Sequence, residues 1–268
     1  MIKICDIVFN YNSTGYTNIS YTGATGVNAS VDGQPKAVIN VTNNTISVSN
    51  LNPGTYNLTV TTITDANHNS VTKTVKITVN KIKTKLTANA ITTTYNVDDN
   101  LVITLKDNAG NVLSGVKVTV DLNGAKTYTT DNNGQVKVST NGLTPKTYTA
   151  KITFNGNTYY NKSSKDVKVT VKKAKPLITA KAKTFKEKIK TKKYAITLKG
   201  NTGKAIKNAK VTLKVNGKTF TAKTNSKGKT TFKITNLNKK GKYKAVITYK
   251  RNAYYNTVSK KVKITVKK

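Results

Sequence analysis

The chain has 268 residues, of which 36% are apolar and 21% charged, and its 47 basic residues outnumber its 10 acidic ones to give a formal net charge of +37. One Cys, one His and no Trp leave little for acid/base, redox or metal chemistry, so the composition argues against an enzyme, a cofactor or a metal site. No apolar run approaches the ~20 residues of a membrane helix. Such a high positive charge indicates an anionic partner or surface.

Residues 1–80 form the first of three related stretches. Their recognisable strands begin near Asn18, and Met1–Tyr16, which lacks the basic start and apolar middle of a signal peptide, would have to supply an opening strand. We therefore expect a domain truncated at its N-terminus. Asn-x-Ser/Thr sequons, candidates for N-glycosylation if the chain is exported, occur at Asn12, Asn18, Asn28, Asn40, Asn43, Asn57 and Asn161.

Residues 81–173 carry clear strand and turn signals. Apolar and polar residues alternate along Val116–Val120, as in a half-buried strand. Asn123-Gly124 tolerates the positive φ angles of a two-residue hairpin turn. Asp131–Gly134 marks the next turn, and strands are predicted over Gln135–Thr140 and Val167–Val171.

Residues 174–268 repeat these elements. Without a gap, Tyr148–Lys173 and Tyr243–Lys268 are identical at 16 of 26 positions, which indicates a repeated unit. Boundaries are expected at Asn80-Lys81 and at Lys172–Pro176, where proline disfavours continued strand pairing. The third copy has an alternating strand over Val211–Val215 and turns at Asn216-Gly217 and Asn225–Gly228. Its two further strands are predicted over Lys229–Thr235 and Val262–Val266.

About seven short strands per unit of roughly 94 residues, without helical periodicity, predict an antiparallel immunoglobulin-like (Ig-like) sandwich. The predicted fold class is all-β, with three tandem Ig-like β-sandwich domains at 1–80, 81–173 and 174–268 in an elongated rod. A leucine precedes a tyrosine by five or six residues in each unit. The spacing resembles a tyrosine corner, in which the hydroxyl bonds to upstream backbone. The tyrosines are Tyr56, Tyr148 and Tyr243.

Two stretches carry a family resemblance. Leu105–Gly124 (LKDNAGNVLSGVKVTVDLNG) followed by Thr130–Thr140 (TDNNGQVKVST) resembles the Ig-like repeat of invasin and intimin adhesins. Asn50–Val60 (NLNPGTYNLTV) with Asp65–Val79 (DANHNSVTKTVKITV) resembles the Ig-like repeats of archaeal, especially methanogen, adhesin-like surface proteins. The resemblance implies a non-enzymatic stalk or adhesive module of the cell surface.

Positive charge rises along the chain. Residues 1–80 carry four lysines against three aspartates, residues 81–173 carry 14 against six, and residues 174–268 carry 29 basic residues against Glu187 alone. Because the three units share one predicted fold, folding does not require this gradient. We expect the third unit to attach electrostatically to an anionic cell-wall polymer or envelope surface. Candidate contacts on its last strand are Lys261, Lys263, Lys267 and Lys268.

Three alternatives remain open for the partner. The chain could be a pure structural spacer of a larger surface protein, or it could bind a host or microbial surface glycan or protein. Its pI near 10.1 also fits non-specific binding of nucleic acid or another polyanion. Only one arginine, Arg251, is present, and base and phosphate recognition favour arginine, so specific nucleic-acid binding is not expected.

Tyrosine pairs lie in the loop before the last strand of the second and third units. Their rings are candidate ligand contacts that could stack on a sugar, with packing in the sandwich or on a neighbouring unit as the alternative. They are Tyr159, Tyr160, Tyr254 and Tyr255. His68 takes the equivalent place in the first unit and is expected to be structural. A Cys5–His68 catalytic pair and calcium at Asp98-Asp99 or Asp131 are disfavoured, and an isopeptide bond assisted by Glu187 stays open.

Overall fold

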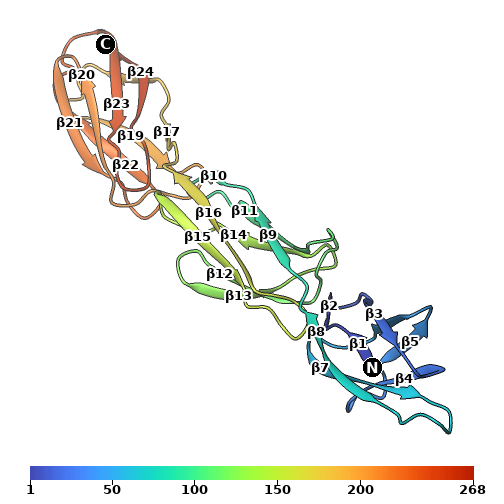
Figure 1. Cartoon of the computed structure of the whole chain (residues 1–268). Coiled ribbons are helices and arrows are strands. Elements are labelled where there is room, and N and C mark those ends of the chain that lie inside the picture. The colour runs from blue at the N-terminus through green and yellow to red at the C-terminus, as the bar shows by residue number, and fades with distance from the viewer. The chain divides into compact units, whose positions relative to one another are not determined.

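The computed structural model describes all 268 residues and contains 24 strands and no helix (Figure 1). Strand pairing falls into three segments, which we call the first (Ile2–Asn80), second (Thr84–Lys172) and third (Leu177–Lys267) segments, with two sheets in each. The predicted all-β fold is confirmed. No helix that could cross a membrane is found.

The first segment has two four-stranded sheets, ordered β1-β3-β6-β5 and β2-β8-β7-β4. The stretch Met1–Tyr16, which was expected to supply one opening strand, supplies two strands and the start of a third. The strands are β1 (Ile2–Ile4), β2 (Ile7–Asn10), β3 (Gly15–Tyr21), β4 (Gly26–Val31), β5 (Val38–Thr42), β6 (Thr45–Ser49), β7 (Gly54–Ile63) and β8 (Thr72–Asn80).

The second and third segments each have a three-stranded and a five-stranded sheet. The orders are β14-β11-β9 and β10-β16-β15-β12-β13 in the second, and β17-β19-β22 and β18-β24-β23-β20-β21 in the third. The second contains β9 (Thr84–Ala88), β10 (Ile91–Thr94), β11 (Asn100–Asp107), β12 (Lys117–Asp121), β13 (Ala125–Thr129), β14 (Gln135–Ser139), β15 (Thr147–Phe154) and β16 (Ser163–Lys172). The third contains β17 (Leu177–Thr179), β18 (Lys183–Lys186), β19 (Lys192–Lys199), β20 (Lys210–Val215), β21 (Lys218–Lys223), β22 (Lys229–Ile234), β23 (Gly241–Tyr249) and β24 (Val258–Lys267).

Each segment has eight strands rather than the expected seven, because its opening stretch is split between the two sheets. The first piece pairs antiparallel in one sheet, as β1 does with β3. After a short break the second piece pairs parallel with the last strand in the other sheet, as Ile7 does with Ile77, Ile91 with Val169 and Lys183 with Ile264. The prediction of a purely antiparallel sandwich is therefore wrong at this one strand of each segment.

The first segment differs from the others in the partner of its fifth strand. Asn43 and Asn44 both have positive φ and form a two-residue turn that pairs β5 with β6. In the second and third segments, Asn123-Gly124 and Asn216-Gly217 have positive φ and pair the equivalent strand with the one before it. The two predicted Asn-Gly hairpins are confirmed, and the position of the tight turn decides which sheet receives the strand.

The three predicted tyrosine corners are confirmed. Each hydroxyl donates to a backbone carbonyl four residues upstream, from Tyr56 to Asn52 at 2.8 Å, from Tyr148 to Thr144 at 3.0 Å and from Tyr243 to Lys239 at 2.7 Å. Each tyrosine lies near the start of the penultimate strand. The bond holds the chain where it crosses from one sheet to the other.

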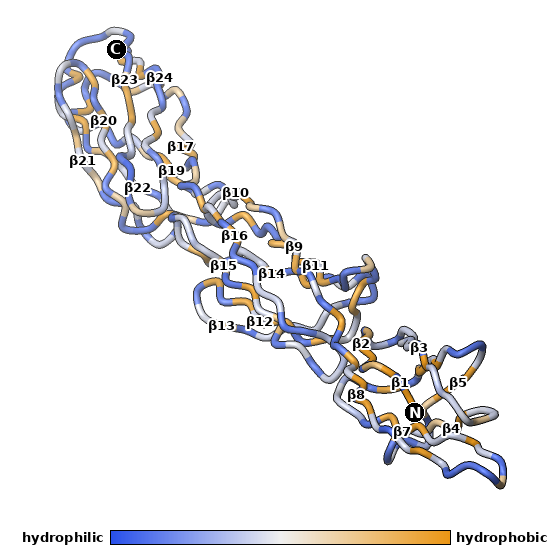
Figure 2. The backbone as a smooth tube through the Cα atoms, in the orientation of Figure 1, coloured by the Kyte–Doolittle hydropathy of each residue, from blue (hydrophilic) through white to orange (hydrophobic).

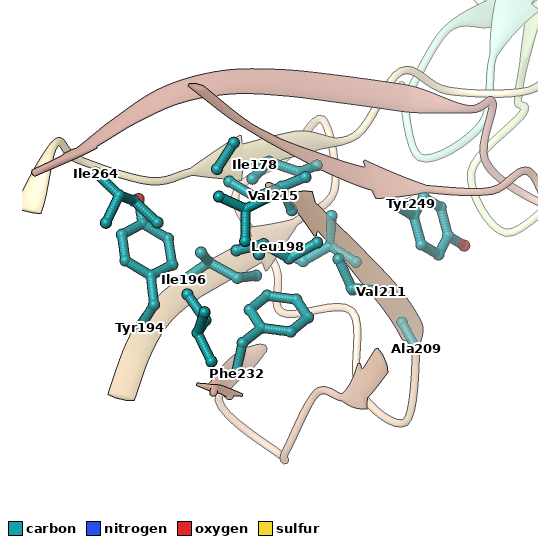
Figure 3. Close-up of a cluster of buried hydrophobic side chains, with 14 of the residues drawn as sticks. Ile178, Tyr194, Ile196, Leu198, Ala209, Val211, Val215, Phe232, Tyr249 and Ile264 are labelled. Atoms are coloured by element: carbon teal, nitrogen blue, oxygen red, sulfur yellow. The ribbon is translucent and has the colours of Figure 1, made fainter. Parts of the chain in front are cut away.

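Apolar side chains fill the space between the two sheets. Hydrophobic and hydrophilic residues alternate along the strands (Figure 2), and in the third segment the inward residues of both sheets meet in one core (Figure 3). Ile196 and Leu198 of β19 lie near Val211 and Val215 of β20 there, and Tyr194 lies beside Ile264 of β24. Burial of these side chains at ~1.5–3 kcal/mol each is the main source of stability, since no disulfide forms.

By spatial contact the chain groups into two compact units. One comprises Met1–Ala88, Ile103–Val136 and Lys151–Asp166, and the other comprises Asn89–Val102, Lys137–Ala150 and Val167–Lys268. The three predicted domains, 1–80, 81–173 and 174–268, each enclose one strand segment but do not coincide with these units. The three-domain division therefore stays a prediction.

Candidate functional site

The third segment carries a continuous lysine-coated surface on the outer side of its five-stranded sheet. Inward residues such as Val211, Ile247 and Ile264 are fully buried, so their neighbours along each strand point outward. We call this surface the lysine face. Its lysines, all exposed, are Lys186, Lys210, Lys214, Lys223, Lys242, Lys244, Lys261, Lys263 and Lys267.

Strand register brings lysines from different strands into direct opposition. Lys244 of β23 lies opposite Lys263 of β24, and Val246 lies opposite both Lys261 and Lys214. Opposed residues in neighbouring strands are about 5 Å apart and alternate residues along a strand about 7 Å. Like charges in direct opposition destabilise a sheet, so this arrangement works against folding.

Two hollows indent the lysine face. One lies over β23 and β24 and is lined by Lys242, Lys244, Val246, Lys261 and Lys263, with Tyr243 and Val262. The other lies at the far end of β20, β21 and β23, where Thr212, Thr221 and Thr248 contribute hydroxyl-bearing side chains. The cationic residues of this second hollow are Lys207, Lys210, Lys250 and Arg251.

No carboxylate neutralises these lysines. The single ion pair of the chain joins His68 and Asp65. Glu187, the only acidic side chain after residue 173, accepts a hydrogen bond from the backbone N–H of Lys240 at 3.2 Å. The lysine face therefore presents its full positive charge to solvent.

The equivalent sheet of the second segment carries a mixed charge. Where the third segment has Lys214 and Lys261, the second has Asp121 and Asp166, and Asp121 lies opposite Lys151. In the first segment the equivalent sheet carries mainly threonines, which pair across β7 and β8 as Thr55 with Thr78, Thr59 with Thr74 and Thr61 with Thr72. The lysine face is thus a feature of the third segment and not of the fold.

The smaller sheet of the third segment has its own outward lysines, but fewer of them. Buried residues of β19 and β22 alternate with Lys193, Lys199, Lys229 and Lys233. Alanine and threonine occupy the outward positions between them, at Ala195, Thr197 and Thr231. This opposite face has four outward lysines on its strands, against nine on the lysine face.

The predicted envelope-binding lysines all lie at the surface. Lys261, Lys263 and Lys267 point outward from β24, with Lys267 opposite Lys186, and Lys268 follows the end of the strand. The residues that alternate with them point inward, with Ile264 and Val266 buried and Val262 half-buried. Sequence reasoning missed the lysines on neighbouring strands, although the alternation of Lys242 and Lys244 with Tyr243 and Ala245 could have placed them.

The tyrosine pairs lie in a loop that recurs with the same hydrogen bonds. The Asn157 side-chain oxygen accepts from the N–H groups of Tyr159 and Tyr160 at 2.9 Å, and Asn252 does the same for Tyr254 and Tyr255. In both copies the second tyrosine also forms a parallel bridge to a residue shortly before the segment's first strand, Ile82 or Ala174. The loop therefore holds the stretch of chain that leads into the segment, and we call it the clasp loop.

The two tyrosines of each pair differ in exposure. Tyr159 and Tyr254 are 37% and 39% exposed, whereas Tyr160 is half-buried and Tyr255 only 8% exposed. A side chain at Gly200 would clash with the Tyr255 hydroxyl, since a Cβ there would lie 2.6 Å from it. Burial raises the pKa of Tyr255. Tyr255 therefore serves packing. The more exposed rings also contact other tyrosines, Tyr159 with its centroid 4.7 Å from that of Tyr11 and Tyr254 5.0 Å from that of Tyr95, and ligand contact stays a prediction for both.

The polar residues weighed for catalysis or calcium binding form local hydrogen bonds. His68 Nδ1 lies 2.7 Å from Asp65 Oδ1, and this hydrogen bond lowers the pKa of Asp65. Asp131 Oδ1 accepts from the N–H groups of Asn133 and Gln135, and Asp98 accepts from the hydroxyl of Ser139. No group of three His, Cys, Asp or Glu side chains could hold a metal ion.

A buried lysine in the third segment was not foreseen. Lys192 is 1% exposed, and its Nζ donates to the carbonyls of Ile189 at 2.7 Å and Glu187 at 3.4 Å. A buried cation is tolerated only when it is hydrogen-bonded. Lys192 therefore ties the loop after β18 to β19 and takes no part in the surface charge.

The seven candidate glycosylation sites are all exposed. Asn18, Asn28, Asn40 and Asn57 lie on strands, whereas Asn12 and Asn43 lie in turns and have positive φ. Asn161 differs from the others because its side-chain amide donates to the carbonyl of Lys81 at 3.3 Å.

No family model matches the chain, and no curated protein matches its sequence. Among solved structures, a 1.5-MDa bacterial ice-binding adhesin is 15% identical with a TM-score of 0.34, over 100% of this chain and 98% of that chain. An I-band fragment of titin is 10% identical with a TM-score of 0.40, over 100% and 97%. A tetra-tandem repeat from the extending region of a large adhesion protein is 15% identical with a TM-score of 0.39, over 97% and 74%.

Proposed function

We propose that this chain is a non-enzymatic, adhesin-like stalk of the cell surface, whose third segment attaches electrostatically to an anionic cell envelope. One observation carries the proposal. Segments with nearly the same strand arrangement carry different charges on the same sheet, and the lysines of the third segment oppose one another without a carboxylate to neutralise them. An arrangement that costs folding energy is retained when a partner uses it.

The stalk role is supported by the repeated sandwich and by the lack of reactive groups. Tyrosine corners recur in all three segments and clasp loops in the second and third, and each serves to hold the sandwich together. Tandem sandwiches of this kind extend a protein and present its surfaces at a distance. The archaeal source, the extracellular location and the three-domain rod belong to this proposal.

The test exchanges charges between equivalent positions of the second and third segments. Lys214→Asp with Lys261→Asp gives the third segment the residues of the second, and Asp121→Lys with Asp166→Lys makes the opposite change. We expect the full chain to co-sediment with an anionic envelope preparation at about 10 mM salt. The first variant should bind less and the second at least as well as the original.

Two results would contradict the proposal. One is a full chain that stays in the supernatant at low salt, and the other is binding that persists at about 1 M salt, where screening reduces the Debye length to about 3 Å. Equal binding by both exchange variants would also contradict the role of the third segment.

A further inference from the structure

The spacing of the lysines on the lysine face matches that of the charges on a linear polyanion. Two lysines of β24, Lys261 and Lys263, lie beside Lys242 and Lys244 of β23 along the hollow, which Val246 also lines. Outward side chains repeat at about 7 Å along a strand. The four cations therefore form two adjacent rows, one on each strand, and Val246 continues the β23 row opposite Lys261.

From this arrangement we infer that the hollow over β23 and β24 binds a linear polyol phosphate, with successive phosphodiesters placed between the two lysine rows. The inference rests on the proposed function and names its ligand chemistry. Three backbone bonds of an extended peptide span ~3.3–3.6 Å, so six backbone bonds of an extended polymer span about 7 Å. A polymer with six backbone bonds per phosphate therefore places its charges about 7 Å apart. Its charge spacing thus equals the lysine spacing along each strand.

The composition of the hollow favours this polymer over nucleic acid. Lysine acts as a point charge towards phosphate, whereas base readout uses arginine and single-strand binding uses stacked aromatic rings. The outward positions around Val246 contain neither, and Tyr243, which also lines the hollow, packs against the core. Val246 is half-buried and apolar, so it suits the carbon spacer between two phosphates, while the lysine stems cover apolar surface on either side.

The second hollow continues the row of positive charge along the same sheet. Lys214 lies between the hollows, opposite Val246 on one side and Thr219 on the other. Lys210, Lys250 and the hydroxyl-bearing Thr212 and Thr248 follow at the far end. A polymer longer than a few repeats can therefore remain over positive charge from one hollow to the next.

The experiment uses the full chain and two variants with the same change in net charge. The face variant carries Lys242→Gln, Lys244→Gln, Lys261→Gln and Lys263→Gln, all at exposed outward positions. The control variant carries glutamine at the four outward lysines of the opposite face, by Lys193→Gln, Lys199→Gln, Lys229→Gln and Lys233→Gln. A thermal midpoint no lower than that of the original chain, with unchanged β-sheet circular dichroism, shows that both variants are folded.

The probes separate the source of the phosphate. Binding is measured to soluble poly(glycerol phosphate), to vesicles of phosphatidylglycerol, which present the same glycerol phosphate group on a lipid, and to duplex DNA. We expect the full chain to bind the polymer more tightly than the vesicles or the DNA at equal phosphate. The face variant should lose at least about 100-fold in affinity for the polymer, since each lysine near an anionic surface contributes roughly a factor of five. The control variant should lose less than about tenfold.

The possible failures are distinguishable. Equal losses in the two variants, or tighter binding to vesicles or DNA, overturn the inference and leave envelope attachment intact. Binding to an envelope preparation but not to poly(glycerol phosphate) has the same meaning. A full chain that binds neither the polymer nor the envelope preparation overturns the proposed function as well.

Discussion

The tyrosine corner of the second segment differs from the other two in a way that predicts unequal stability losses. Tyr148 is buried, and its hydroxyl both donates to the Thr144 carbonyl at 3.0 Å and accepts from the Thr144 N–H at 2.9 Å. Tyr243 is half-buried, and its hydroxyl only donates, to the carbonyl of Lys239. Replacement by phenylalanine therefore removes two backbone partners in one segment and one in the other.

The magnitudes follow from which groups lose their partner. Tyr148→Phe leaves a partly buried N–H and a carbonyl without their bonds, which costs about 1–3 kcal/mol. Tyr243→Phe frees the carbonyl of the exposed Lys239, which water can reach, and costs about 0.5–1.5 kcal/mol. Both substitutions preserve the ring, so no large cavity forms.

Hydrogen exchange measured by mass spectrometry reports each segment separately, which a single unfolding curve of a multi-segment chain does not. Amides of β15 and β16 should exchange about 5- to 150-fold faster in Tyr148→Phe, and those of β23 and β24 about 2- to 12-fold faster in Tyr243→Phe. An effect of Tyr148→Phe equal to or smaller than that of Tyr243→Phe would refute the reasoning.

Three further predictions concern turns, pH and modification. Gly228 has a φ of 70°, and a Cβ there would clash with the Leu198 carbonyl, whereas Gly217 has a φ of 74° with open space around it. Gly228→Ala should therefore lower the stability of the third segment by more than about 2 kcal/mol, and Gly217→Ala by about 1 kcal/mol. Hydrogen exchange measures both losses. Burial by itself raises the pKa of the Asp107 carboxyl, but the hydrogen bonds from Asn111 and from neighbouring N–H groups together outweigh it and hold the pKa below its ordinary value. The contribution of Asp107 to stability is therefore present above about pH 4 and lost as the pH falls through the folded pKa. The thermal midpoint should accordingly fall less between about pH 5 and 2 in Asp107→Asn than in the original chain. In a glycosylating host, sequons of the first segment should be modified more fully than Asn161, whose amide is hydrogen-bonded, and an intact mass equal to the bare polypeptide contradicts this.

Features with local causes were predictable from the sequence. The hairpins at Asn123-Gly124 and Asn216-Gly217 follow from residues that tolerate positive φ. The tyrosine corners join residues four apart, so their spacing identifies them without knowledge of the rest of the chain. Alternation along Val211–Val215 correctly gives the buried face of that strand.

Features that depend on distant partners were not predictable in the same way. Period-two alternation is the same in parallel and antiparallel strands, so it does not show that Ile7 pairs parallel with Ile77, 70 residues away. The transfer of β5 to the other sheet has a local signal in Asn43-Asn44, which was not recognised as a tight turn. The burial of Lys192 has no signal in a lysine-rich sequence.

The candidate site was only partly predictable for the same reason. The sequence placed Lys261 and Lys263 on one outward row, but their opposition to Val246 and Lys244 depends on the register between β23 and β24. The aspartates that occupy equivalent positions in the second segment gain meaning only when the two sheets are compared. Charge counts along the sequence therefore identified the third segment as the most basic one, but they did not show which of its surfaces carries the lysines.

The central proposal is that unneutralised positive charge attaches the third segment to an anionic cell envelope. The direct measurement is the affinity of the full chain for an isolated envelope preparation as a function of salt concentration. We expect the logarithm of the affinity to fall linearly with the logarithm of the salt concentration, with a slope of about −3 or steeper, because four or more lysines displace counterions. A slope near zero, with affinity unchanged between low and high salt, would contradict the account.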